Sequence, residues 1–130
     1  MSIDVYWFDR EHTIVRYDFS GSWTWDEVYA AVDAAIALEN SVSHRVDVVL
    51  NLLESGHIPP NAITHLKTIA TTRIPANVKM AVLITENKAM NVLFNIGSRL
   101  YRKIEEQFYV AASVDSALEV INKAREQELG

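Results

Sequence analysis

The sequence predicts an α/β protein with a five-stranded mixed sheet and four helices. Strand-like and helix-like segments alternate from residue 13 onward, which is typical of parallel strands joined by helical crossovers. The segments 46–53 and 78–85 are almost continuously apolar, as strands are when both of their faces are buried. Two short strand-like segments open the chain, so the first strand is expected at an antiparallel edge of the sheet.

The N-terminal segment has the pattern of a β-hairpin. Residues 3–8 and 13–19 are rich in β-branched and aromatic side chains, and the polar residues 9–12 separate them. Alternate side chains of a strand point to opposite faces. One face of the second strand is therefore largely apolar and the other partly polar: Val15, Tyr17 and Phe19 against Ile14, Arg16 and Asp18.

The first helix is expected over residues 25–39. Thr24 precedes Glu27 by three residues, which is the spacing of a capping box, and Asp26 adds a negative charge to the first turn. The apolar positions that follow helical spacing are Trp25, Val28, Val32, Ala35 and Ile36.

The central unit consists of a strand over residues 46–53 and a second helix. The strand is expected to be central and parallel because its apolar run is nearly unbroken. The helix should start near Pro60 or Asn61 and end near Thr72, and Pro75 prevents any continuation. Its expected inner face consists of Ala62, Ile63, Leu66, Ile69 and Ala70.

The C-terminal part adds two further β/α units. Asn87 and Ser113 are suitable N-cap residues for their helices. The expected elements are a strand over 78–85, a helix over 88–104, a strand over 107–112 and a helix over 114–128.

The composition indicates one globular domain over residues 1–130, long enough to bury a core. The net charge of −5 disfavours nucleic acid as a partner, because phosphate neutralisation requires clustered Lys and Arg. The absence of cysteine excludes disulfides and thiolate catalysis. The chain has no secretory pattern at its start, no cofactor motif and no apolar run near the roughly 18 residues of a membrane span, so we expect a cytoplasmic protein.

At this level of detail the chain resembles a known family. Gly21 at the end of the second strand and the segment VVLNLL, residues 48–53, are similar to the STAS or anti-sigma-factor-antagonist family, which is related to the lipid-binding CRAL-TRIO-like domains. The resemblance covers nearly the whole chain. It implies a four-turn β/α superhelix with the first strand added at the sheet edge, the turns being 13–39, 46–72, 78–104 and 107–128.

The resemblance also raises the question of a phosphorylated residue. STAS proteins that switch partners typically carry a phosphorylated Ser or Thr at the start of the helix after the VVLNLL-like strand. That position falls near Pro60 or Asn61, whereas Ser55 lies too early and Thr64 lies inside the helix. Pro59 and Pro60 also lack the backbone N–H groups that would hold a phosphate. We therefore expect the usual phosphoacceptor serine to be missing.

The loop after residues 46–53 is the candidate ligand or partner loop, because ligands in α/β proteins usually bind at the carboxyl ends of strands. Its candidate residues are Glu54, Ser55, His57, Asn61 and Thr64. Glu54, His57 and His65 can in principle bind a metal, but their spacing matches no zinc motif. Ser55 does not lie in a nucleophile elbow. We predict neither a catalytic residue nor a metal site, and solvated polar positions are the simpler interpretation.

Aromatic residues form a second candidate feature. Trp7, Trp23 and Trp25 lie within the first 30 residues and can form an exposed patch or line an apolar pocket. The alternative is that they simply pack the first helix on the sheet, and Trp23, immediately before that helix, can be a staple residue.

The helix expected over residues 88–104 offers a candidate dimer face. Met90, Phe94 and Tyr101 lie beside its inner apolar stripe, so its apolar surface is wide. Such a surface is suited to a second copy of the chain or to another protein.

These observations lead to three functional hypotheses. The first is a non-enzymatic STAS-like regulatory or protein-interaction domain, acting on a protein partner or as a homodimer. The second is a carrier of a small apolar ligand or lipid, although 130 residues leave little room for a pocket of roughly 300 Å³. The third is an enzyme that uses His57 or His65 with Glu54.

Overall fold

The computed structural model describes residues 2–86 and 108–129. In chain order the elements are β1 (Ile3–Trp7), β2 (Ile14–Gly21), α1 (Trp25–Asn40), β3 (Val46–Ser55), α2 (Ala62–Thr72), β4 (Val78–Ile84), β5 (Phe108–Ala111) and α5 (Val114–Leu129). The expected order of elements is therefore confirmed over these residues. The helix predicted over 88–104 lies outside them, so the four-turn superhelix stays a prediction.

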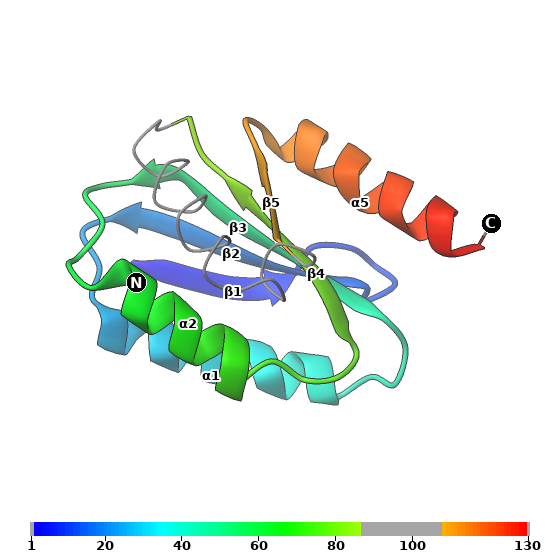
Figure 1. Cartoon of the computed structure of the whole chain (residues 1–130), viewed down its shortest axis with the longest axis horizontal. Helices are drawn as coiled ribbons and strands as arrows, with labels where there is room; N and C mark the ends of the chain where they lie inside the picture. Colours follow the sequence, from blue (N-terminus) through cyan, green and yellow to red (C-terminus); the bar gives the residue numbers. More distant parts are fainter. Residues whose placement is uncertain (1, 87–107, 130) are drawn as a thin grey trace.

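The five strands form one mixed sheet in the order β1-β2-β3-β4-β5 (Figure 1). β1 pairs antiparallel with β2, and the pairs β2–β3, β3–β4 and β4–β5 are parallel. The predicted mixed sheet, with its antiparallel strand at one edge, is thus confirmed. β3 is the central strand, and Val46 and Val49 are fully buried in it, as its apolar run predicted.

Helices cover both faces of the sheet. α1 and α2 lie together on one side and α5 lies on the other (Figure 1). The core beneath α1 contains Val15, Tyr17 and Phe19 from β2, and the core beneath α5 contains Ile14 and Val49. The predicted apolar face of the second strand is therefore the one that α1 covers.

Two of the predicted helix caps are present. The Thr24 hydroxyl accepts a hydrogen bond from the backbone N–H of Glu27 at 3.2 Å, and the Ser113 hydroxyl accepts one from Ser116 at 3.1 Å. α2 begins differently: Asn61 adopts the left-handed conformation at its N-cap and makes no capping hydrogen bond through its side chain. The helix therefore starts at Ala62, slightly later than the sequence suggested.

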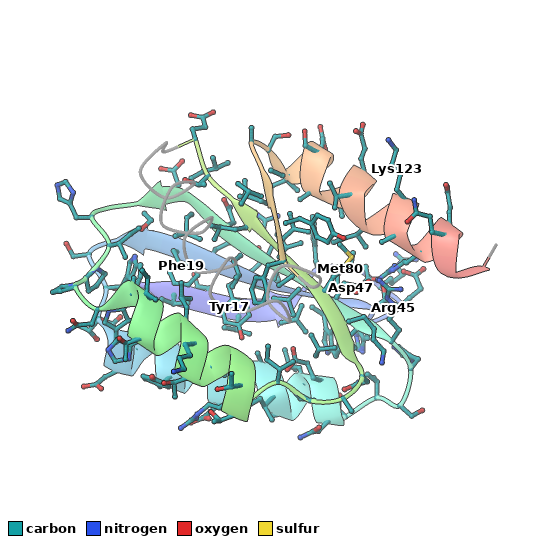
Figure 2. All side chains as sticks on the ribbon, viewed as in Figure 1. Tyr17, Phe19, Arg45, Asp47, Met80 and Lys123 are labelled. Atoms are coloured by element: carbon teal, nitrogen blue, oxygen red, sulfur yellow. The ribbon has the colours of Figure 1, made fainter. Side chains whose placement is uncertain are left out.

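A buried carboxylate joins α5 to the sheet. Asp47, the second residue of β3, is fully buried and accepts hydrogen bonds from Nε of Arg45 at 3.1 Å and Nε of Arg125 at 2.9 Å. Arg125 also donates from Nη2 to the carbonyl oxygen of Thr13 at 3.0 Å. Figure 2 shows Arg45 and Asp47 close together below the C-terminal half of α5. This ion cluster connects the start of β2, the start of β3 and the last helix.

Replacing Asp47 with Ala is expected to lower the free energy of unfolding by roughly 3–5 kcal/mol. The reason is that two arginine side chains would remain side by side without the buried carboxylate that neutralises them. Urea unfolding followed by circular dichroism measures the loss.

The matched control for that experiment is Asp33→Ala. The ion pair between Asp33 and Arg73 is 2.6 Å long, but the Asp33 side chain is 65% exposed. Removal of a solvent-exposed pair should cost less than about 1 kcal/mol. Equal losses in the two variants would contradict the anchoring role of Asp47.

Candidate functional site

The candidate loop begins where β2 and β3 end side by side. Gly21 pairs with Ser55 in the parallel register, and the N–H of Gly56 donates to the carbonyl oxygen of Gly21 at 2.9 Å. A Cβ atom at Gly56 would lie 3.2 Å from that oxygen, so the close approach favours glycine. Gly21 has a positive φ of 60°, a conformation that L side chains rarely adopt. The ends of β2 and β3 are therefore held together at the points where the chain leaves β2 towards α1 and leaves β3 towards α2.

Ser55 supports the indole of Trp23. Trp23 is 6% exposed, and its Nε1–H donates to the Ser55 hydroxyl oxygen at 2.8 Å. The same hydroxyl donates to the carbonyl oxygen of Gly56 at 3.0 Å. Both its donor and one of its acceptor positions are occupied, so Ser55 has a structural role here.

Trp25 fixes the proline segment that leads into α2. Its indole N–H donates to the carbonyl oxygen of Pro60 at 2.8 Å and lies 3.3 Å from that of Pro59. Its ring stacks on His65 with a centroid distance of 4.8 Å and meets the edge of Trp23 at 5.2 Å. Trp25 thus connects the buried aromatic core to the outer helix.

His65 completes the connection between α1 and α2. Its Nδ1 atom lies 2.9 Å from the hydroxyl oxygen of Tyr29, within hydrogen-bond distance. The guanidinium of Arg73, at the end of α2, lies 5.1 Å from the centre of the Tyr29 ring and pairs with Asp33 of α1. Aromatic and ionic contacts therefore connect α2 to α1.

The candidate loop residues differ in their contacts and in their exposure to solvent. Ser55 is engaged with Trp23, and Asn61 forms the left-handed N-cap of α2. Glu54, His57 and Thr64 are exposed, and within residues 2–86 and 108–129 no hydrogen bond or ion pair reaches the side chains of Glu54 and His57. Thr64 lies in the first turn of α2.

The structure separates some residues that the sequence grouped together. His65 contacts Trp25 and Tyr29. Among the described residues, no three His, Cys, Asp or Glu side chains lie close enough to hold a metal ion. Trp7 stacks on His12 at 4.7 Å, at the opposite end of β2 from Trp23. Met90, Phe94 and Tyr101 lie outside the described residues.

A second polar cluster lies on the sheet face that carries α5. Asp18 accepts hydrogen bonds from the Tyr6 hydroxyl at 2.5 Å, from Arg16 Nε at 2.7 Å and from Asn51 Nδ2 at 3.1 Å. Burial alone would raise the pKa of Asp18, but these hydrogen bonds outweigh it and hold the pKa below its usual value. The Arg16 guanidinium also lies 4.8 Å from the Phe8 ring centre. The Asp18 carboxylate thus already accepts hydrogen bonds from three neighbouring side chains.

Sequence reasoning missed Tyr29 and Arg73 as parts of the α1–α2 contact. The available signal was the spacing of Trp25 and Tyr29, which are four residues apart and so lie on one face of α1. Nothing local indicated that this face would meet His65, which is 36 residues away from Tyr29.

Comparison with known proteins does not assign the chain to a family. No protein-family model matches the sequence, and no curated protein matches it significantly. Within residues 2–86 and 108–129, no helix is both long and apolar enough to cross a bilayer.

Replacing Ser55 with Ala is expected to lower the free energy of unfolding by about 1–3 kcal/mol, because the buried Trp23 N–H would lose its acceptor. Chemical unfolding followed by tryptophan fluorescence measures the change. Ser43→Ala, at an exposed loop position, is the matched control and should change stability by less than about 0.5 kcal/mol. A stability of the Ser55 variant equal to that of the control would show that the indole hydrogen bond is unimportant.

Proposed function

We propose that the chain is a non-enzymatic, STAS-like protein-interaction domain that lacks the usual phosphoacceptor serine. The order of its strands and helices supports this proposal, as does the residue at the N-cap of α2. Asn61 occupies that position, and Pro59 and Pro60 precede it. The place where the resemblance expects a phosphorylated hydroxyl therefore carries none.

One observation carries the proposal: Ser55 of the candidate loop and His65 of α2 make contacts that hold the loop and the helix in place. The Ser55 hydroxyl supports Trp23, and the His65 ring is held between Trp25 and Tyr29. Groups fixed by such contacts are suited to presenting a surface, whereas a nucleophile and its base need to face a substrate.

The surface that these contacts present is the outer side of α2. Ala62 is the one buried side chain among those described in this helix, and Leu66 is 36% exposed. α2 lies at the outside of the molecule, against α1 (Figure 1). An exposed leucine alone is ordinary. Its place on a helix fastened by aromatic contacts makes this the surface that we assign to a protein partner.

The alternative of an apolar ligand carrier has less support. A hollow lined by Ile74, Val78, Met80 and Phe108, among others, has a volume of about 10 Å³. That volume is enough for about one water molecule, whereas a ligand pocket needs roughly 300 Å³ or more. For the enzyme alternative, His65 is engaged with Tyr29, and among the described residues no hydrogen bond or ion pair joins Glu54 to His57.

A photo-crosslinking amino acid at Leu66 tests the proposal in cells that naturally express the protein. We expect a covalent adduct with a specific protein, because this side chain lies on the assigned surface. Lys123 is the matched control position, since it is exposed and projects from α5 on the other side of the sheet (Figure 2).

Three outcomes distinguish the hypotheses. An adduct from Leu66 but not from Lys123 supports the proposed surface. If the adduct has twice the 14.7 kDa mass of the chain, the partner is a second copy, and light scattering should then show the same dimer. No adduct from Leu66, or the same adducts from both positions, would contradict the proposal.

A further inference from the structure

Glu39 is buried without the partners that a buried carboxylate normally has. The residue is 4% exposed, and no hydrogen bond or ion pair reaches its carboxyl group from any described residue. Asp47, the other buried acid in the part of the chain that the structure describes, lies between two arginines. Burial raises the pKa of Glu39 to about 7, because the ionised form is poorly solvated there.

The surroundings of Glu39 do not compensate its charge. Glu39 lies in the last turn of α1, which contains no basic residue, and the negative end of the helix dipole opposes a negative charge at this place. The titratable group that couples to it is Tyr17 of β2, which is itself 6% exposed. The pKa of Tyr17 is raised by its burial and, to a smaller extent, by the charge of Glu39. None of the other charged side chains of α1, β1 and β2 shifts the pKa of the Glu39 carboxyl group.

The backbone at Glu39 belongs to a clamp. The Asn77 side-chain amide donates to the carbonyl oxygens of Glu39 at 2.9 Å, His44 at 3.2 Å and Val42 at 3.4 Å. The carbonyl oxygen of Asn77 accepts from the N–H of Val46 at 2.9 Å. Asn77, the residue immediately before β4, thus holds the end of α1 and the segment 41–45 against the sheet.

We propose that Glu39 is a proton-controlled latch for the end of α1 and the segment 41–45. When it is protonated, the neutral carboxyl stays beside Tyr17 and the clamp of Asn77 remains closed. When the proton is lost, the carboxylate leaves for water and the last turn of α1 moves with it. The hydrogen bond from Asn77 to the Glu39 carbonyl is then lost. The latch is closed in mildly acidic solution and opens as the pH rises through neutrality.

The variant Glu39→Gln tests the latch through stability. The pKa of Glu39 is higher in the folded chain than the unfolded value near 4.5. The stabilisation from the protonated form is therefore fully present below about pH 4.5 and is lost as the pH rises through about 7. Glutamine stays neutral, so the variant should match the wild type at pH 5 and melt about 5 °C or more above it at pH 8.5.

The control variant is Asp33→Asn, at an exposed position in the same helix. Its melting temperature should vary with pH as that of the wild type does. Parallel melting profiles for the wild type and Glu39→Gln would overturn the proposal.

Hydrogen exchange measures whether the opening is local. After correction for the intrinsic pH dependence, the amides of residues 39–45 should lose about tenfold protection between pH 6 and 8.5 in the wild type, and none in Glu39→Gln. Tyr17→Phe should keep the response, because burial of the carboxyl and not the tyrosine charge causes it. Loss of protection spread evenly over α1 and the sheet, or abolition of the response by Tyr17→Phe, would overturn the latch.

Discussion

The buried carboxylate of Asp47 is the constraint on which the assembly of the sheet and its last helix depends. α5 contacts the sheet through apolar side chains such as Ala117 and Ile121, and such non-directional contacts alone specify its position weakly. Arg125 reaches from α5 to Asp47 and to the carbonyl oxygen of Thr13. Hydrogen bonds to a charged group are directional and costly to leave unmade in the interior. They therefore fix both the direction and the register of the helix on the sheet.

The two buried acids among the described residues avoid an uncompensated charge in opposite ways. A carboxylate taken out of water must be paired or protonated. Asp47 is paired with two arginines and forms a permanent connection. Glu39 has no such partner among the described residues, and its burial raises its pKa to about 7. A glutamine would fill the same place without a charge at any pH, which is why we interpret the glutamate as a regulatory feature.

At the carboxyl ends of β2 and β3, several of the described side chains make structural contacts. In many α/β proteins this edge of the sheet binds ligands. Here Trp23, Trp25 and Tyr29 extend the apolar core outward from α1, and Ser55 and His65 serve as their hydrogen-bonding or stacking partners. The result is a loop and a helix held in one position, and such preorganisation would lower the entropic cost of binding the partner that we propose.

The sequence by itself determined the elements whose causes are local. The cap at Thr24 depends on residues three positions apart, the hairpin on two neighbouring strands, and the central place of β3 on an uninterrupted apolar run. Only the tertiary structure decided which distant groups meet. Arg125 is 78 residues from Asp47, and His65 is 36 residues from Tyr29. The burial of Glu39 likewise depends on where α1 crosses the sheet. Local sequence patterns reflect interactions between residues that are close together in the chain. The contacts of Arg125 and His65 form only when the helices dock, so no periodicity of the sequence predicts them.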